Sequence, residues 1–266
     1  MYAKTKDGLN IYYEIKGNAE AKETIIFLNG LSQATVSWYF MLPCFEDKYR
    51  LVLMDFIFQG QSDKTGEWRT FDQHAEDVVQ VLNATNSTKV IVIGISYGSL
   101  VAQHLALNHP EYVSKLVLLS TFAHKTPYFE AIEYAWWKAL EIGGYSLMFD
   151  IMLPNVLSEN YFKNPLIPIE TLREIRQQSN QNKDALFKLM RATKERPDYR
   201  QKLKEIKVPT LVIHGEKDNL ITLSMGSDVA NHIPNAKFKI IPDAGHTLNM
   251  EKIKDVCIEI LKFLNE

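Results

Sequence analysis

Short runs of Val, Ile and Leu alternate with longer amphipathic segments along most of this chain. The apolar runs occupy residues 24–28, 50–54, 89–93, 115–119, 210–213 and 237–241. Strands of a parallel sheet that helices cover on both faces have such near-continuous apolar sequences. Helical spacing of apolar residues marks segments between these runs, at 72–86, 97–108, 223–232 and 252–264. The alternation therefore predicts an α/β fold with a mostly parallel sheet and helices on both faces.

Two further strands are expected at the start of the chain. Residues 2–6 and 9–16 are separated by Asp7-Gly8, a dipeptide typical of a tight hairpin turn. Together with the six apolar runs, this hairpin predicts a sheet of eight strands.

Residues 122–204, called the lid segment below, interrupt the alternation because they contain no convincing strand. The segment is predicted to form several helices separated by Pro127, Pro154, Pro165, Pro168 and Pro197. Structureless loops of this length are rare, so we expect a helical lid (cap) inserted into a core domain of residues 1–121 and 205–266. Its aromatic residues either pack onto the core or line an apolar pocket. Phe122, Trp136 and Trp137 are the predicted substrate-binding residues.

Composition excludes several classes of function. Thirty Lys and Arg against thirty-two Asp and Glu give a formal charge of −2, so no basic field favours nucleic acid. No apolar stretch approaches the roughly 18 residues that a membrane span needs, and Met1–Gly8 lack the apolar run of a secretory signal. The two cysteines, Cys44 and Cys257, cannot form a framework of several disulfides, and no C-x-x-C sequence could hold a metal. We therefore expect a soluble, cytoplasmic globular protein, and composition by itself indicates no chemistry.

The sequence Gly94-Ile95-Ser96-Tyr97-Gly98 lies between a predicted strand and a predicted helix. In that context G-x-S-x-G is a nucleophile elbow. The sharp turn forces the serine into a strained backbone conformation and exposes its hydroxyl, while the flanking glycines relieve contacts with neighbouring backbone. We therefore predict Ser96 as a nucleophile.

A nucleophilic serine needs a base that is oriented by an acid. With such an elbow, the acid and then the histidine follow the serine in the chain, each beyond a late strand. Asp218 follows the strand at 210–213, and His246 follows the strand at 237–241. Because these strands are parallel to the strand before the elbow, we predict that Ser96, Asp218 and His246 form a catalytic triad.

Other histidines and acids fit these positions less well. His74, His104, His109 and His232 lie in or beside predicted helices, whereas His124 begins the lid segment and His214 precedes the predicted acid. Glu216 and Asp243 are the alternative acids, but Glu216 lies nearer the strand and Asp243 is only three residues from His246.

The negatively charged oxygen that forms during acyl transfer needs at least two donors. The N–H of Tyr97 is one, because it lies at the start of the helix after the elbow. The second is expected after the strand at 24–28, where Asn29-Gly30 lets the chain turn and direct the N–H of Leu31 at the substrate.

The order of these motifs resembles the α/β-hydrolase superfamily, and the resemblance covers the whole chain. The sequences G-I-S-Y-G, H-G-E-K-D and D-A-G-H are similar to its nucleophile, acid and base motifs, and the lid segment to its lid. The resemblance implies the triad and the two backbone donors named above. Many members have His-Gly where this chain has Asn29-Gly30.

A narrower resemblance concerns three loops. Asn29-Gly30 followed by Thr35, Ser37 and Trp38 is similar to N-G-x-x-x-x-T-x-S-[FW] of bacterial 3-hydroxyacyl transferases of the rhamnolipid-lipid type. The sequences at 55–62 and 243–251 are also similar to that group. At the elbow, however, those enzymes carry S-W-G-G, whereas Ser96-Tyr97-Gly98-Ser99 is closer to esterases and enol-lactonases.

Three functions agree with these motifs. The first is a serine hydrolase that cleaves a carboxylic ester, thioester or lactone of an apolar acyl substrate through an acyl-enzyme, without metal or cofactor. The second is a 3-hydroxyacyl acyltransferase that uses the same acyl-enzyme, and the third is a ligand receptor with little turnover. Halide displacement is disfavoured because it requires Asp at the position of Ser96.

Overall fold

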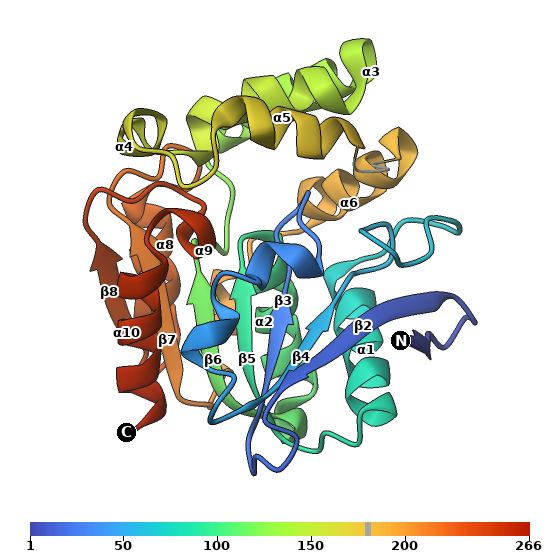
Figure 1. The fold of residues 1–266 in the computed structure, drawn as a ribbon, viewed down its shortest axis with the longest axis vertical. Helices are drawn as coiled ribbons and strands as arrows, with labels where there is room; N and C mark the ends of the chain where they lie inside the picture. Colours follow the sequence, from blue (N-terminus) through green and yellow to red (C-terminus); the bar gives the residue numbers. More distant parts are fainter. Residues whose placement is uncertain (179–181) are drawn as a thin grey trace.

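The computed structural model describes residues 1–178 and 182–266. Its central feature is one eight-stranded sheet with the strand order β1-β2-β4-β3-β5-β6-β7-β8 (Figure 1). The strands are β1 (Tyr2–Lys4), β2 (Asn10–Gly17), β3 (Thr24–Leu28), β4 (Arg50–Met54), β5 (Val90–Ile95), β6 (Val113–Leu119), β7 (Thr210–Gly215) and β8 (Lys237–Ile241). β2 pairs antiparallel with β1 and β4, and every other pair is parallel. The predicted mostly parallel sheet is therefore confirmed.

Helices cover both faces of this sheet because successive side chains of a strand point to opposite faces. In β3, Ile26 and Leu28 join one hydrophobic core, whereas Ile25 and Phe27 join the other. The first core lies under α1 (Phe71–Ala84), α2 (Tyr97–Asn108) and α8 (Leu223–His232). The second lies under η1 (Thr35–Trp38), η2 (Leu42–Cys44), α9 (Leu248–Glu251) and α10 (Ile253–Leu264). A further short helix, η3 (Pro110–Tyr112), precedes β6.

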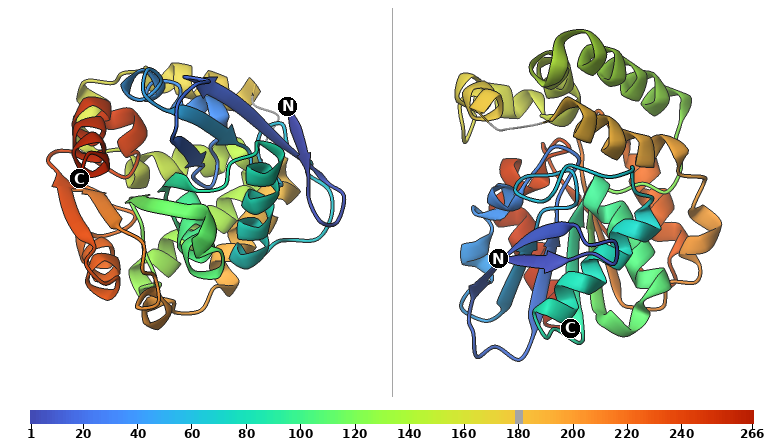
Figure 2. Two further views of the ribbon diagram at one scale, coloured as in Figure 1. Left: turned by 90° about the horizontal axis from the view of Figure 1, so that it is seen from below. Right: turned by 90° about the vertical axis from the view of Figure 1, so that its right-hand side faces the viewer.

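Between β6 and β7 the described residues contain helices and no strand. These helices are α3 (Pro127–Val156), α4 (Glu159–Lys163), α5 (Ile169–Gln178), α6 (Lys183–Glu195) and α7 (Arg200–Leu203). Figures 1 and 2 show α3, α5 and α6 as a layer beyond the carboxyl ends of the parallel strands. The lid segment therefore lies at the edge where the predicted site residues gather.

The expectation that prolines separate these helices is confirmed in part: Pro165 and Pro168 lie between α4 and α5, and Pro197 lies between α6 and α7, whereas Pro127 and Pro154 belong to α3. Pro154 lies inside α3, where it costs one backbone hydrogen bond close to the helix end. The break within α3 is at Gly144, with φ 67° and ψ −162°, a conformation essentially restricted to glycine. Pro127 is the first residue of α3, where a missing N–H costs nothing.

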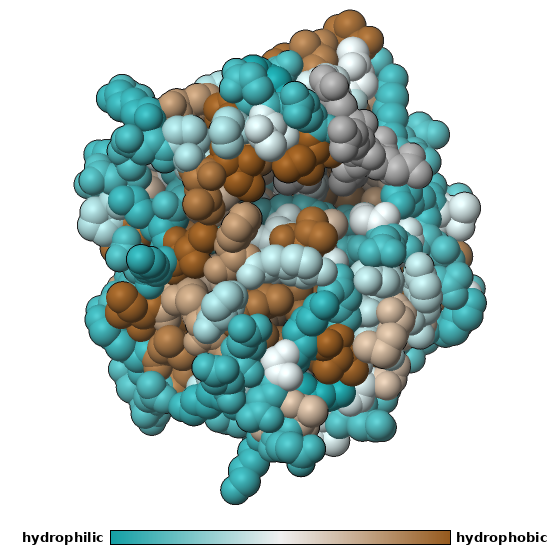
Figure 3. Space-filling view, in the orientation of Figure 1, coloured by the Kyte–Doolittle hydropathy of each residue, from teal (hydrophilic) through white to brown (hydrophobic). Residues whose placement is uncertain are grey.

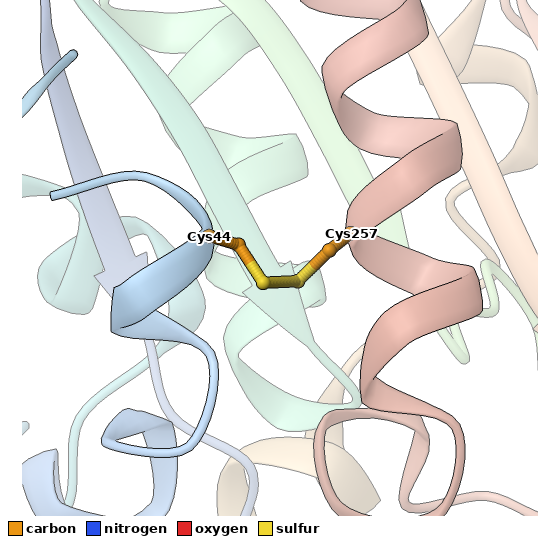
Figure 4. Close-up of a disulfide and its surroundings, with 2 residues drawn as sticks. All are labelled: Cys44 and Cys257. Atoms are coloured by element: carbon orange, nitrogen blue, oxygen red, sulfur yellow. A yellow bond between two sulfur atoms is a disulfide. The ribbon is translucent and has the colours of Figure 1, made fainter. Parts of the chain in front are cut away.

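Cys44 and Cys257 form one disulfide, which joins η2 to α10 across 213 residues of sequence (Figure 4). A framework of several disulfides was not expected, and this single bond joins two elements over the same face of the sheet. No helix of the described residues combines the length and hydrophobicity needed to cross a membrane.

Candidate active site

Ser96 lies in the tight turn between β5 and α2, at the carboxyl edge of the sheet. Its φ of 51° and ψ of −117° are the strained values expected of an elbow. A Cβ at Gly98 would collide with the carbonyl of Leu28, and one at Gly94 with the carbonyl of Gly98. Both glycines of the motif are therefore required by close backbone contacts, as the sequence predicted.

Two backbone amides beside Ser96 have no acceptor among the described residues. The N–H of Tyr97 lies in the first turn of α2, where no acceptor within the helix exists. The N–H of Leu31 is also unbonded in the loop after β3. Because Leu31, Ser96 and Tyr97 line the same cavity, both N–H groups lie beside Ser96. The N-terminus of α2 adds a positive potential there.

His246 lies in the loop after β8, and its Nδ1 is 2.8 Å from Oδ2 of Asp218. Both side chains are buried, with 4% and 7% of their residues' surface exposed. The Ser96 hydroxyl caps no helix N–H, and no hydrogen bond joins it to His246 in the described structure. Such hydrogen bonds are often long in sites without substrate and shorten only in the reacting complex.

The Asp218 carboxylate is held by several donors. Its Oδ1 accepts the N–H groups of Leu220 at 2.9 Å and Ile221 at 2.8 Å, and His214 Nε2 is 3.3 Å from its Oδ2. Burial by itself would raise the pKa of Asp218, but His246 and His214 lower it below the ordinary value through their charge and their hydrogen bonds to the carboxylate. Asp218 is therefore a carboxylate at neutral pH, and it fixes the orientation of the His246 ring.

A main cavity of about 450 Å³ opens beside Ser96 between the lid segment and the core. Ser96 and His246 both line it, and none of its described lining residues is Asp, Glu, Lys or Arg. The lid segment contributes the apolar residues Trp136, Phe149, Met152, Leu153, Val156, Leu157, Ile167, Leu172 and Ile175. Figure 3 shows hydrophobic side chains gathered on this face, where the surface is hollowed below the lid segment. The cavity suits an uncharged, apolar group.

The predicted substrate-binding aromatics lie in different places. Trp136 lines the main cavity and a second, smaller cavity that also borders Ser96, and Phe122 lines the smaller one. Trp137 lines a third cavity and packs against Phe187, with ring centroids 4.6 Å apart. Trp136 and Phe122 are thus brought to Ser96, and Trp137 is not.

Residues 23–253 match the sequence model of the family described as alpha/beta hydrolase fold. The chain belongs to the alpha/beta hydrolase fold family. The 3-oxoadipate enol-lactonase 1 of Acinetobacter baylyi is 28% identical, over 93% of this chain and 90% of that protein. The pimeloyl-[acyl-carrier protein] methyl ester esterase of Vibrio atlanticus is 24% identical, over 95% and 97%.

A solved structure agrees with this assignment. MGS-M2, an alpha/beta hydrolase enzyme from a Medee basin deep-sea metagenome library, matches with a TM-score of 0.88 at 27% identity. The match covers 97% of this chain and 95% of that one. The likeness therefore includes the lid segment as well as the sheet.

In this hydrolase the loop that carries Leu31 is fixed by Gln59, which the sequence did not single out. The Gln59 amide donates to the carbonyls of Gly30 at 2.8 Å and Leu31 at 3.0 Å. Asn29 completes the support, since its side chain donates to the carbonyl of Met54 at 2.8 Å. The only signal in the sequence was the motif at 55–62, which contains Gln59.

Two further residues fix the loop of His246. The Ser120 hydroxyl donates to the His246 carbonyl at 2.7 Å, and Ser120 itself has a positive φ of 48°. The Glu251 carboxylate accepts the N–H groups of Gly245 and Ser158, each at 3.1 Å. Glu251 thus connects this loop of the hydrolase to the lid segment, a contact between residues far apart in sequence.

No three His, Cys, Asp or Glu of residues 1–178 and 182–266 gather in a way that could hold a metal ion. The cavities beside Ser96 are lined mostly by apolar residues, and His246, Gln33, Asn249 and Glu133 are among their polar ones. A serine hydroxyl and an imidazole are groups that can act as a nucleophile and as an acid–base group.

Proposed function

We propose that this protein is a serine hydrolase that cleaves the carboxylic ester, thioester or lactone of an uncharged, apolar acyl substrate. The observation that carries the proposal is the arrangement of Ser96 and His246 on one apolar cavity, with Asp218 bound to the far side of the His246 ring. Serine as nucleophile, histidine as base and a buried carboxylate are the three groups that acyl transfer to serine needs.

In the proposed mechanism Ser96 attacks the carbonyl carbon while Nε2 of His246 takes its proton. Asp218 stabilises the imidazolium that results. The N–H groups of Leu31 and Tyr97 donate to the negatively charged oxygen, which forms only as the carbonyl is attacked. His246 then protonates the leaving group. In the second half of the reaction His246 takes a proton from water, the water attacks the acyl-enzyme, and Ser96 is released together with the free acid.

The lid segment, residues 122–204, would act as a cap that holds the acyl group and excludes bulk water from it. This is supported by the apolar side chains that α3 and α5 contribute to the main cavity. The lack of a charged residue among the described lining favours a neutral acyl group, since an unpaired carboxylate would be costly to bury there.

The first test is the Ser96→Ala variant assayed with p-nitrophenyl octanoate. We expect kcat/KM to fall about 10⁴-fold or more, because the base and the backbone donors cannot replace the nucleophile. Ser114→Ala, at the opposite end of the sheet on β6, is the matched control and should retain full activity. Undiminished turnover by Ser96→Ala would exclude the proposed mechanism.

Product analysis separates hydrolysis from acyl transfer. With an octanoyl thioester and an added hydroxyacyl or thiol acceptor, the proposed hydrolase releases free octanoic acid. Formation of the acyl-acceptor product in excess over free acid would identify an acyltransferase instead.

A further inference from the structure

Ser96 borders two cavities of different chemistry. Besides the main cavity, Ser96 lines the second, smaller cavity described above, together with Leu31 and Tyr97. This cavity of about 40 Å³ is called the inner cavity below. The inner cavity is walled mainly by apolar residues, and Glu133 of α3 is the one charged residue among its described lining. A substrate whose carbonyl lies at Ser96 can therefore extend into two different spaces.

Glu133 also lines the third cavity, which contains Trp137, has a volume of about 300 Å³ and is called the outer cavity below. Among the described lining residues, Glu133 is the one that the inner and outer cavities share. Lys125, Lys138 and Lys194 contribute charged groups to the wall of the outer cavity. Glu133 thus lies between a cavity beside Ser96 that has no other charged residue among its described lining and a cavity lined by several lysines.

The Glu133 carboxylate makes no hydrogen bond or ion pair with any residue that the structure describes, although neighbouring lysines have partners. Lys138 Nζ lies 2.6 Å from Glu141 Oε2, and Lys125 Nζ donates to the carbonyl of Lys194. Burial raises the pKa of Glu133 to about 7, because the attraction of Lys125 and Lys194 offsets only part of the desolvation. A half-buried carboxylate without a donor is costly unless a ligand supplies one.

We propose that the inner cavity receives the leaving group, and that Glu133 accepts a hydrogen bond from a hydroxyl on that leaving group. The inference rests on the proposed function and narrows it to esters of an apolar acid with a short hydroxylated alcohol. The acyl chain fills the main cavity, which is about 450 Å³, because the inner cavity of about 40 Å³ is too small for it. When the ester C–O bond breaks, the alkoxy oxygen, which lies beside Ser96 where the two cavities meet, takes the proton that His246 holds, and the alcohol is released.

The test uses two esters of equal shape, 2-hydroxyethyl octanoate and n-propyl octanoate, which differ by one hydroxyl in place of a methyl group. We expect the wild type to favour the hydroxyethyl ester by about tenfold in kcat/KM, because a site that binds a hydroxyl rejects the analogue without it. Glu133→Leu should reduce this ratio to about one, and Glu133→Gln, which keeps an acceptor, should give an intermediate ratio. Glu130→Gln changes a residue of the outer cavity alone and should leave the ratio unchanged.

Three outcomes would overturn the inference. A wild-type ratio of about one, or an unchanged ratio in both Glu133 variants, excludes the hydrogen bond from the leaving group to Glu133. If Ser96 is still needed to cleave n-propyl octanoate in that case, the proposed function stands. Absence of Ser96-dependent cleavage of either ester overturns both. If Glu133→Leu does not fold, the conservative Glu133→Gln decides, since it must lower the ratio for the inference to stand.

Discussion

Several buried residues that do not line the main cavity determine the geometry at Ser96. Asp55, with 1% of its surface exposed, accepts the N–H groups of Thr35 at 2.8 Å and Gln61 at 2.9 Å. Trp38 donates from its ring nitrogen to the Asn29 side chain at 2.8 Å. These residues belong to the loop motifs that resemble those of 3-hydroxyacyl transferases in sequence, and their hydrogen bonds lie next to the loop of Leu31. Their contacts therefore support the loop that carries the proposed backbone donor, Leu31.

Gln59→Leu removes the two hydrogen bonds that hold the loop of Leu31. We expect kcat on p-nitrophenyl octanoate to fall about 10- to 100-fold with little change in KM, because the donor acts on charge that develops in the transition state. Unfolding free energy should fall by about 1–3 kcal/mol, since two buried carbonyls lose their donor. Gln61→Leu, an exposed neighbour, is the control, and a wild-type kcat in Gln59→Leu would contradict the role.

The free energy of unfolding of the Asp218→Asn variant should depend on pH less than that of the wild type does. The pKa of Asp218 is lower in the folded protein than in the unfolded chain, so its stabilising effect is complete above about pH 4 and is lost as pH falls. We expect the variant to be about 2 kcal/mol less stable at neutral pH. Chemical unfolding at a series of pH values should show this difference narrowing below about pH 4.

The control for that series is Asp243→Asn, which removes one of the two alternative acids named from the sequence. Asp243 is exposed, so its replacement should change neither stability nor its pH dependence appreciably. A difference between Asp218→Asn and wild type that stays constant down to pH 2 would contradict the lowered pKa.

At the scale of elements, the loop of His246 and the end of α3 form one hydrogen-bonded unit. The N–H groups of His246 and Thr247 donate to the carbonyl of Val156 at 3.1 and 3.2 Å. Glu251 on α9 adds its bonds to Gly245 and Ser158. The carboxyl end of α3 is therefore fixed to the proposed base, and movement of the lid segment is expected away from this end.

Glu251→Ala tests that connection. We expect the unfolding free energy to fall by about 2 kcal/mol, because a charged acceptor of two backbone donors is lost. Activity on p-nitrophenyl octanoate should fall about tenfold through kcat, since the His246 loop is less well positioned. Glu259→Ala removes a surface ion pair on α10 and should have little effect on either. Equal effects of the two variants would show that Glu251 has no special role.

For the whole molecule, the disulfide is the covalent link over one face of the sheet. Cys44 on η2 and Cys257 on α10 are 213 residues apart, so the bond closes most of the chain into a loop. A long loop restricts the unfolded chain strongly, and a disulfide of this kind typically contributes about 2–4 kcal/mol. The second hydrophobic core is the region that it stabilises.

Reduction should therefore lower the resistance of the protein to denaturant. We expect excess dithiothreitol to move the urea midpoint downward by an amount equivalent to about 2–4 kcal/mol, with both thiols then open to alkylation. The double variant Cys44→Ala, Cys257→Ala should have the urea midpoint of the reduced protein, and dithiothreitol should not change that midpoint. An unchanged midpoint after verified reduction would contradict this contribution.

Much of the fold was predictable because strands and helices have local periodicities. Residues 24–28, 50–54 and 237–241 are strands with the bounds that the sequence predicted. The break in α3 was not predictable from the prolines, because Pro154 lies near the end of the helix, where a proline is tolerated. The break is at Gly144, whose conformation is essentially restricted to glycine, but the presence of a glycine in the sequence does not show that this conformation is adopted.

The sequence by itself determined the α/β fold, the family and the elbow, since each depends on neighbouring residues. It also named three candidate triad residues, because the strand ends at which they lie share one edge of a parallel sheet. Only the tertiary structure decided which side chains support them: Gln59, Ser120 and Glu251 act across long stretches of chain. The tertiary structure also decided the disulfide, the apolar main cavity and the position of Glu133 between two cavities. Packing brings together the residues of each feature, and their separation in the sequence follows no period that could predict the contact.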